Sequence, residues 1–446
     1  MSPVRRAAPP ESLPEAGVPP RPARVAAMAQ ALQGSEILQI AAEIRALRAA
    51  GAEICNLTVG DFDPKQFPIP SELRREVVAA LDEGETNYPP SEGLPELRAA
   101  VCRFYERELG LACEPKNVLV AGGARPLLYV AYRTLLERGE RVVYPTPSWN
   151  NNHYAHLAEA EGVPVACGPA TRFLPTEREL APLLPGARLL SLNSPLNPTG
   201  TAFEPEVLRR IAAAVVDENR ARKARNERPL FLLYDQVYWK LCVEGVRHVT
   251  PGALVHEVAD VTVYVDAISK SFAATGLRVG WAVGPADLIE RMSAVLGHVG
   301  GWAPRAEQRA TARFLDDAPA VERYLVGFKA AVAARLARLH AGFEAMKRRA
   351  LPVESLAPQG AIYLSARILA HGKHTPVGTT LRTGEDVRRY LLEAAGIGIV
   401  PFRAFGVQSD GAPDSQGWFR LSVGAVSLAE IDAALPRVER ALAALR

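Results

Sequence analysis

The sequence is poor in cysteine and lacks any long run of apolar residues. Its five cysteines stand singly, without a C-x-x-C pair, and their number is odd. This pattern argues against a disulfide framework or a zinc cluster and favours a reducing compartment. No run of about 18 apolar residues could cross a membrane, and the proline-spaced N-terminus lacks the apolar core of a signal peptide. We therefore expect a cytoplasmic protein.

Charge of one sign is also scarce. The 52 basic and 49 acidic residues nearly cancel, to a net charge of +3, and the basic residues form no long cluster. This balance argues against nucleic acid or an anionic membrane as a partner. A hydrophobic content of 48% and a charged content of 23% are ordinary for a soluble globular protein.

The chain is long enough for more than one domain, since it has 446 residues. Residues 1–24 are rich in proline, and we expect a disordered tail there. A helix is predicted over 33–50, with Ser35 as its cap and Gly51 after its end. We assign 25–75 to an N-terminal arm and part of a small domain, 76–315 to a large domain, and 316–446 to a small α+β domain.

Apolar strands alternate with amphipathic helices through the middle of the chain. Examples are the strand-like stretches "NVLVA", "RLLSLN", "LFLLYD" and "VTVYVDA". This alternation predicts an α/β fold with a doubly wound, mostly parallel sheet. Ligands of such sheets bind beyond the carboxyl ends of the strands, and the residues discussed next all follow strand-like stretches.

Lys270, in "VDAISKS", is an unusual residue for the end of an apolar strand. It could simply extend to solvent, or its amine could form a Schiff base with a carbonyl group if its pKa is lowered. Ser269 and Ser271 flank it, Arg278 follows eight residues later, and all three suit a phosphate. A carbonyl compound that carries a phosphate, such as pyridoxal 5'-phosphate, would use all of these groups.

Pyridoxal phosphate also needs a phosphate cup and a carboxylate for its pyridinium nitrogen. The loop of Gly123, Ala124 and Arg125 lies between a strand and a helix, where backbone N–H groups and the helix N-terminus favour an anion. A Gly-Gly loop alone is a weak signal. Asp235 ends an apolar strand, where an acid is costly unless it is paired. It could pair with the pyridinium or serve as an ordinary cap or ion pair.

The cofactor ring would also need hydrogen-bond donors and a stacking partner. Tyr238, three residues after Asp235, and Asn197 in "NSPLNPTG" could both donate to the ring oxygen. Trp149 in "PTPSW" offers an indole face, although a buried tryptophan is often plain core.

The ordered motifs resemble the class I/II aminotransferases of fold type I, which depend on pyridoxal phosphate. They are "NYPPSEG", "GGAR", "PTPSW", "SPLNPTG", "YDQVYW", "SKSFAATGLRVGW" and "FRLSVG". "NPTG" and the lysine motif are the specific ones, and the resemblance covers roughly residues 35–446. It implies a transferase that moves an amino group from an L-amino acid to a 2-oxo acid in two half-reactions.

The resemblance implies roles for the residues already named. Lys270 would hold the cofactor and then move a proton, Asp235 would pair with the pyridinium, and Trp149 would stack on the ring. Tyr238 and Asn197 would donate to the ring oxygen. Ser269, Arg278 and the backbone of 123–125 would hold the phosphate.

Three further residues enter only through the resemblance. Arg420, in "GWFRLSVG", would bind the substrate α-carboxylate, and the backbone of Gly60 would lie beside that carboxylate. Tyr88 would reach the cofactor phosphate of a neighbouring subunit, which implies a homodimer with shared sites.

Some positions depart from the family pattern. Gln236 stands where the family usually has Glu, and Ala267 where it often has a phosphate-binding Ser. "VPFRAFG" carries Phe402 and Arg403 at the substrate entrance, in place of the familiar proline and glycine. The phosphate then depends more on Ser269, Arg278 and the glycine loop.

The substrate is suggested by Arg125, which follows the glycine loop where some aspartate aminotransferases carry a lysine. It could bind the distal carboxylate of aspartate or glutamate, or face the phosphate or solvent. Aromatic or broad specificity is the next alternative. The motifs are also compatible with a C–S lyase, a decarboxylase or a cyclase of the same fold. A ligand-sensing regulator would need a DNA-binding domain, for which the tail is too short.

Overall fold

The computed structural model describes residues 25–32, 34, 36–407 and 416–446. The chain falls into two compact units, residues 1–33 and 34–446. Within the described part of the first unit lies one short helix, α1 (Ala27–Ala31). The expected tail over 1–24 and the expected cap Ser35 lie outside the described residues. The remaining description concerns the second unit.

The order of elements along the second unit matches the predicted alternation of strands and helices. The helices are α2 (Glu36–Ala49), α3 (Ser71–Asp82), α4 (Pro95–Leu109), α5 (Ala124–Leu135), α6 (Asn151–Leu157), α7 (Glu177–Leu180), α8 (Pro205–Ala224), α9 (Pro251–Leu254), α10 (Ile268–Ser271), α11 (Ala286–Val299), α12 (Arg305–Asp316), α13 (Ala318–Arg348), α14 (Gly384–Ala395) and α15 (Leu428–Ala443). The strands are β1 (Cys55–Asn56), β2 (Val118–Ala121), β3 (Arg141–Thr146), β4 (Glu161–Ala166), β5 (Ala187–Asn193), β6 (Phe231–Asp235), β7 (Thr262–Ala267), β8 (Gly280–Val283), β9 (Val353–Ser355), β10 (Tyr363–Ile368), β11 (Ile397–Gly398), β12 (Val400–Pro401) and β13 (Trp418–Ser422).

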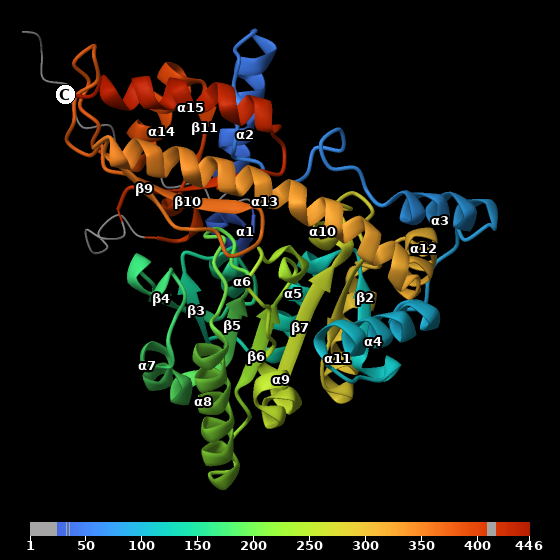
Figure 1. The fold of residues 1–446 in the computed structure, drawn as a ribbon. Coiled ribbons are helices and arrows are strands. Elements are labelled where there is room, and N and C mark those ends of the chain that lie inside the picture. Colours follow the sequence, from blue (N-terminus) through green and yellow to red (C-terminus); the bar gives the residue numbers. More distant parts are fainter. Residues whose placement is uncertain (1–24, 33, 35, 408–415) are drawn as a thin grey trace, which may run out of the picture. The chain divides into compact units, whose positions relative to one another are not determined.

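The largest sheet has seven strands in the order β2-β8-β7-β6-β5-β3-β4 (Figure 1). Strands β7, β6, β5, β3 and β4 pair in parallel, whereas β8 runs antiparallel to both of its neighbours. The carboxyl ends of β5, β6 and β7 therefore lie side by side at one edge of the sheet. The prediction of an α/β fold with a mostly parallel sheet is confirmed.

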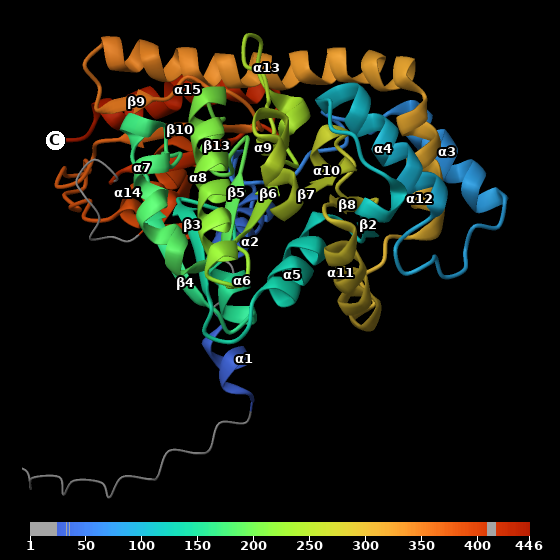
Figure 2. The same ribbon diagram turned by 90° about the horizontal axis from the view of Figure 1, so that it is seen from below.

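Both faces of this sheet are covered, because its strands are apolar on both sides. Successive residues point to opposite faces of a strand, and in β2 Val118 and Val120 belong to one buried cluster and Leu119 and Ala121 to another. Helices α4, α8 and α12 pack in the first cluster, and α5 and α11 in the second. Figure 2 shows α5 and α11 side by side. Continuous apolar runs are typical of such doubly covered parallel strands.

A second sheet lies over the carboxyl ends of the large one. It has the antiparallel order β12-β13-β10-β9, and β1 and β11 form a separate parallel pair. Ser365 of β10 donates to the carbonyl of Thr199 at 2.8 Å, so this sheet touches the loop that follows β5. The long helix α13 contacts α12 as well as β9 and β10 (Figure 1). The loops after β5, β6 and β7 are thereby enclosed between two sheets.

The predicted helix over 33–50 is α2, and its buried side chains Ile37, Ile40 and Ile44 follow helical spacing. Gly51, with φ of 92°, follows its end. Within the described ranges, no helix combines the length and the apolar character that crossing a membrane would require. The division into a large and a small domain at residues 75 and 315 stays a prediction.

Candidate active site

The candidate residues gather where β5, β6 and β7 end. Asn193 and Asp235 are partners in the register of β5 and β6, and Asp235 pairs with Val265 of β7. The sequence suggested that Lys270 ends a strand. It lies instead in α10, the single helical turn directly after β7. The turn aims the lysine toward the space between the two sheets.

Lys270 is half-buried there and contacts the loop that follows β1. Its Nζ donates a 2.5 Å hydrogen bond to the carbonyl of Gly60. Burial, together with the charges of Arg420, Arg125 and Arg278 and against the opposing charge of Asp61, lowers the pKa of the amine to about 8. Desolvation and like charges disfavour the ammonium form, so a larger fraction of this amine is neutral near physiological pH than of an ordinary lysine.

Asp235 provides a buried carboxyl group at the end of β6. Its Oδ1 accepts a 3.1 Å hydrogen bond from the backbone N–H of Val237. Burial raises the pKa of this carboxyl to about 7, and the Val237 hydrogen bond opposes that rise only in part. No ion pair within the described residues involves Asp235. A cationic N–H placed beside it would relieve the cost of burying this charge.

Arg420 lies fully buried in β13, and its guanidinium reaches the loop after β5. Its Nη1 donates to Oδ1 of Asn197 at 3.1 Å, and its Nη2 donates to the carbonyl of Thr58 at 2.6 Å. Its Nε is buried and has no hydrogen-bond partner in the described part of the chain. The guanidinium stacks on two rings, 4.6 Å from the centroid of Tyr363 and 4.8 Å from that of Phe405. Arg420 is therefore a fixed cation that still has an N–H group available to bind a ligand.

Gly60 permits this close arrangement. A Cβ atom at this position would lie 3.1 Å from the hydroxyl of Tyr363 and 3.7 Å from Nη1 of Arg420. A side chain would therefore fill the space between Lys270 and Arg420. Gly60 therefore lies beside the guanidinium of Arg420, and its expected place beside a substrate carboxylate stays a prediction.

A second guanidinium lies across an aromatic pair from Arg420. The Cζ atom of Arg125, in the first turn of α5, lies 5.1 Å from the ring centroid of Trp149. Trp149 in turn lies 6.3 Å from the ring of Phe405, which also contacts Arg420. The two arginines thus flank an aromatic surface formed by Trp149 and Phe405, and both act on the pKa of Lys270.

The glycine loop before α5 fits closely around a third arginine. Arg278 donates through Nη2 to the carbonyl of Gly122 at 2.8 Å and through Nη1 to that of Thr275 at 2.8 Å. Gly123 has a φ of 93°, and a Cβ atom there would lie 2.4 Å from Nη2 of Arg278. Ala124 begins α5, so its backbone N–H lies at the positive end of a helix. These features bring a guanidinium and a helix N-terminus together, which is the kind of setting that binds phosphate.

Two serines flank Lys270 in α10. Ser269 is buried, and the hydroxyl of Ser271 is buried without a hydrogen-bond partner among the described residues. An unpaired buried hydroxyl is costly. Together with the uncompensated Asp235 and the Arg278 cradle, it indicates a polar group that completes the site. These features fit a ring with a cationic nitrogen at one end and a phosphate at the other.

The sequence analysis did not identify Tyr363, which the structure places at the centre of the site. Its hydroxyl lies 2.6 Å from the hydroxyl of Tyr238, and its ring supports Arg420. Burial raises the pKa of both tyrosines. In the sequence, Tyr363 is one residue of the apolar stretch "AIYLSARI" and carries no signal of its own. Its position near Arg420 depends on the register of β10 against β13, in which it pairs with Ser422. Phe405 had been noticed only as part of an altered loop.

Tyr88 differs from the residues of this cluster because it is exposed to solvent. Its side chain is 83% exposed, and its ring packs against Trp302 at a centroid distance of 5.6 Å. The backbone of Trp302 borders the glycine loop, since a Cβ atom on Gly122 would lie 3.3 Å from its carbonyl oxygen. An aromatic residue this exposed is unusual and marks a surface that could meet another molecule.

The departures Gln236 and Ala267 adjoin a buried polar network beneath the site. Gln236 donates to the hydroxyl of Tyr105 at 3.1 Å, and the Tyr105 hydroxyl donates to Asp266 at 3.4 Å. The backbone N–H of Ala267 also donates to Asp266, at 2.7 Å. Burial raises the pKa of Asp266 to about 7. Gln236 thus supports a neighbour of the site, which is consistent with an indirect role.

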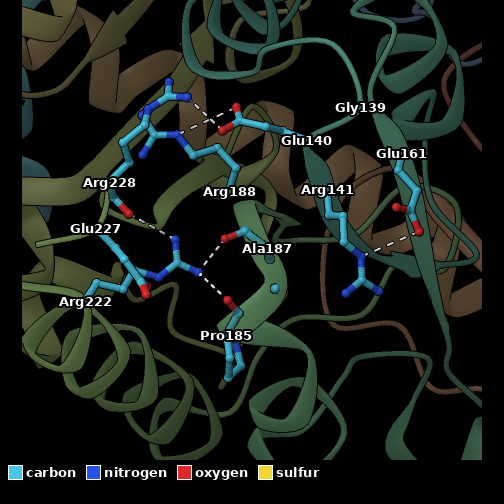
Figure 3. Close-up of a pocket in the computed structure, with 11 residues that line it drawn as sticks. Gly139, Glu140, Arg141, Glu161, Pro185, Ala187, Arg188, Arg222, Glu227 and Arg228 are labelled. Atoms are coloured by element: carbon cyan, nitrogen blue, oxygen red, sulfur yellow. Dashed lines mark hydrogen bonds and ion pairs between the residues drawn. The ribbon is translucent and has the colours of Figure 1, made fainter. Parts of the chain in front are cut away.

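A separate cavity of about 320 Å³ lies at the other end of the strands (Figure 3). Its lining includes Arg141 and Ala187, the first residues of β3 and β5. Figure 3 shows Arg222 reaching the carbonyls of Pro185 and Ala187, at 3.2 and 2.5 Å. These donors are already bound to oxygens of the chain itself. Arg222 therefore stabilises the chain that enters β5, and we do not assign the cavity to an anion.

Comparisons with known proteins agree with this geometry. Residues 52–438 match the family described as aminotransferase class I and II. An aspartate aminotransferase of Rhizobium meliloti (strain 1021) is 31% identical over 410 residues, which cover 91% of this chain and 93% of that protein. An aspartate/prephenate aminotransferase of Thermus thermophilus is 30% identical over 386 residues, which cover 84% of this chain and 91% of that protein. The crystal structure of the aspartate aminotransferase from Rhizobium meliloti has a TM-score of 0.85 at 30% identity, covering 95% of this chain and 100% of that one.

The family match extends from before the glycine loop to beyond Arg420, so it includes both sheets and the whole cluster described above. The fold, with its mostly parallel seven-stranded sheet, is that of fold type I enzymes. The substrates of such an enzyme are an amino acid and a 2-oxo acid. The chain therefore belongs to the class I and II aminotransferases and is a transaminase.

Proposed function

We propose that this transaminase uses pyridoxal 5'-phosphate and takes aspartate or glutamate as its amino donor. The observation that carries the proposal is the set of three guanidiniums that act on Lys270, those of Arg420, Arg125 and Arg278. A cofactor phosphate, a substrate α-carboxylate and a distal carboxylate would supply one anionic group for each. Arginine suits all three, because its planar fork binds carboxylate and phosphate through paired hydrogen bonds.

The residues present fit the cofactor. Lys270 would hold its aldehyde, Asp235 its ring nitrogen, and the loop of Gly123, Ala124 and Arg278 its phosphate. Ser269 would contribute a further donor to the phosphate. When bound, pyridoxal phosphate supplies an electron sink that stabilises negative charge at the substrate α-carbon. Asp235 would strengthen that property, because its carboxylate would favour a protonated ring nitrogen.

The aromatic and polar residues would orient the ring. Trp149 would stack on one face, and Asn197 and Tyr238 would donate to the ring oxygen. Asn197 already accepts from Arg420 at 3.1 Å, so ring and substrate carboxylate would be held by adjoining groups. Such pre-positioning reduces the entropy that must be lost in the reaction.

Lys270 would carry out the proton transfer. Burial and the neighbouring arginines lower the pKa of its amine to about 8, so a neutral amine is more readily available there than on an ordinary lysine to accept a proton from the substrate α-carbon. Lys270 would hold that proton at Nζ and release it later in the same half-reaction. Arg420 and Gly60 would fix the substrate α-carboxylate so that the α-carbon proton faces Nζ.

Acidic specificity rests on Arg125. Its guanidinium lies over Trp149, on the far side of the aromatic pair from Arg420. A four- or five-carbon dicarboxylic amino acid could bridge the two arginines. The names of the relatives from Rhizobium meliloti and Thermus thermophilus both include aspartate, which supports this assignment. An aromatic donor is the second candidate, because Trp149 and Phe405 together offer an apolar surface.

The experiment measures the first half-reaction with single amino acids and no acceptor. The purified protein, supplied with pyridoxal phosphate, should release one 2-oxo acid per site with aspartate or glutamate, and its visible absorbance should change in step. The Arg125→Leu substitution should lower kcat/KM for aspartate by about 10- to 100-fold, which corresponds to the loss of one or two charged hydrogen bonds. The kcat/KM for phenylalanine should not change. Arg133→Leu, on the exposed side of the same helix, is the matched control. An equal loss for both amino acids would place Arg125 on the phosphate instead.

We infer further that two copies of the chain share their sites. The support is Tyr88, whose exposed ring lies beside a residue that borders the glycine loop. In the family resemblance this tyrosine reaches the cofactor phosphate of the neighbouring subunit. Its exposure in a single chain is what that role requires, because the residue must reach outward from its own subunit.

A further inference from the structure

Two of the five cysteines, which stand eleven positions apart in the sequence, meet in the structure. Sγ of Cys102 and Sγ of Cys113 lie 2.9 Å apart. Cys102 is buried in α4, and Cys113 is half-buried in the segment between α4 and β2. A disulfide bond is about 2.0 Å long, so the two sulfurs need to approach by only about 0.9 Å.

The chemical environment distinguishes this pair from the other thiols. The S–H of Cys113, which donates to Cys102, and the charges of Arg103 and Arg98 lower the pKa of the Cys102 thiol. Burial raises the pKa of the remaining three, to about 12 for Cys55 and Cys167 and about 11 for Cys242. Thiolates, not thiols, react with oxidants. Of the five cysteines, Cys102 is therefore the one with an activated sulfur, and it has a partner within reach.

We propose that Cys102 and Cys113 form a redox-active thiol pair that closes reversibly to an intramolecular disulfide when the protein meets hydrogen peroxide. The transaminase reaction has no need of this chemistry. The pair constitutes a modification site outside the cluster around Lys270.

The reaction is balanced with one peroxide per chain. The Cys102 thiolate attacks one peroxide oxygen, an S–O bond forms and the O–O bond breaks, and the leaving hydroxide takes up a proton as water. Sγ of Cys113 then attacks Sγ of Cys102, so that the S–S bond forms and the S–O bond breaks. The second hydroxide leaves as water with the Cys113 proton. The two thiols lose two electrons in total, and peroxide gains them.

The location of the pair predicts its consequence. The cross-link would tie α4 to the segment that enters β2, where Arg98 already donates to the carbonyls of Pro115 and Val118, at 2.9 and 3.0 Å. The glycine loop follows the other end of β2. Closing the disulfide should therefore reinforce an existing contact and leave transaminase turnover close to that of the reduced protein.

The test counts thiols in the full-length protein with its cofactor bound. After brief exposure to a small excess of peroxide, remaining thiols are alkylated in denaturant and the protein is digested and analysed by mass spectrometry. We expect free thiols to fall from five to three, a cross-linked peptide pair that contains Cys102 and Cys113, and return to five thiols with dithiothreitol. Cys102→Ser and Cys113→Ser should each lack the cross-link, whereas Cys242→Ser, which removes a single buried thiol, should form it.

Two results would overturn the proposal. One is five free thiols in the exposed wild-type protein, and the other is a cross-link that joins different cysteines or different chains. Because peptide mapping is performed on the wild-type protein, the conclusion does not depend on the serine variants folding. Turnover, measured on the same samples, reports separately on the proposed function.

Discussion

Lys270 Nζ donates a 2.5 Å hydrogen bond to the carbonyl oxygen of Gly60, 210 residues earlier in the chain. This contact joins the turn after β7 of the large sheet to the loop after β1, which pairs with β11. The amine is thus held at the point where cofactor and substrate are proposed to meet. Its lowered pKa and its position together make it the residue on which the chemistry depends.

Replacement of Lys270→Ala should lower turnover by at least about 100-fold, because removal of a positioned acid–base group costs that much or more. The fold should persist, since the side chain lost is a buried amine whose desolvation is unfavourable. Steady-state kinetics with circular dichroism on the same sample tests this. Lys329→Ala, exposed on α13, is the control. Full turnover of the Lys270 variant would contradict the proposed mechanism.

The buried carboxyl of Asp235 should make the stability of the cofactor-free chain depend on pH. Its pKa is raised from 3.8 to about 7 on folding, so between these values the folded state binds more protons than the unfolded state. The free energy of unfolding should therefore fall as pH rises from about 4 to about 7. The Asp235→Asn substitution should remove part of this pH-dependent loss of unfolding free energy, on the order of 3 kcal/mol. The variant should therefore be stabilised relative to the wild type more at pH 8 than at pH 4.

Denaturant unfolding at several pH values measures this effect. Asp266 should leave a residual slope of the same sign in the variant, because its pKa is also raised to about 7. Asp82→Asn, an exposed position at the end of α3, should leave the whole profile unchanged. Equal pH profiles for Asp235→Asn and the wild type would show that Asp235 is already paired in the folded chain.

Replacement of Arg420→Lys keeps the charge but loses the planar fork. The hydrogen bonds to Asn197 and Thr58 cannot both be kept by an ammonium group of different reach. We expect kcat/KM to fall by about 100-fold for every amino donor, because the α-carboxylate is common to all of them. Arg389→Lys, exposed on α14, is the control. A loss confined to acidic donors would instead assign Arg420 to the distal carboxylate.

Removal of the Tyr88 side chain should weaken cofactor binding without destabilising the single chain. The ring is 83% exposed, so Tyr88→Ala sacrifices little buried area within its own subunit. If its hydroxyl donates to a phosphate in a partner, the dissociation constant for pyridoxal phosphate should rise by about tenfold. Fluorescence titration of the cofactor tests this, with Val377→Ala as an equally exposed control. An unchanged dissociation constant would contradict the shared site.

The sequence by itself predicted the α/β fold, because the apolar strands and amphipathic helices carry distinct periodicities. It also predicted Lys270 and Asp235 as candidates, because each is a charged residue at the end of an apolar run, where burial is costly without a partner. Asn197 was a candidate hydrogen-bond donor in its loop, and Arg420 entered through the family resemblance. Local spacing is enough for such inferences, since strand ends of a parallel sheet fall at one edge.

Contacts between distant segments were decided only by the tertiary structure. Tyr363 looked like core in an apolar strand, and only the register of β10 against β13 placed its hydroxyl on Tyr238 and its ring beneath Arg420. Arg125 could have faced phosphate or solvent, and packing placed it over Trp149. Cys102 and Cys113 read as isolated thiols until the segment after α4 brought their sulfurs together. Sequence pattern fixes which residues must be buried, but the partner that each one meets depends on how separate elements pack.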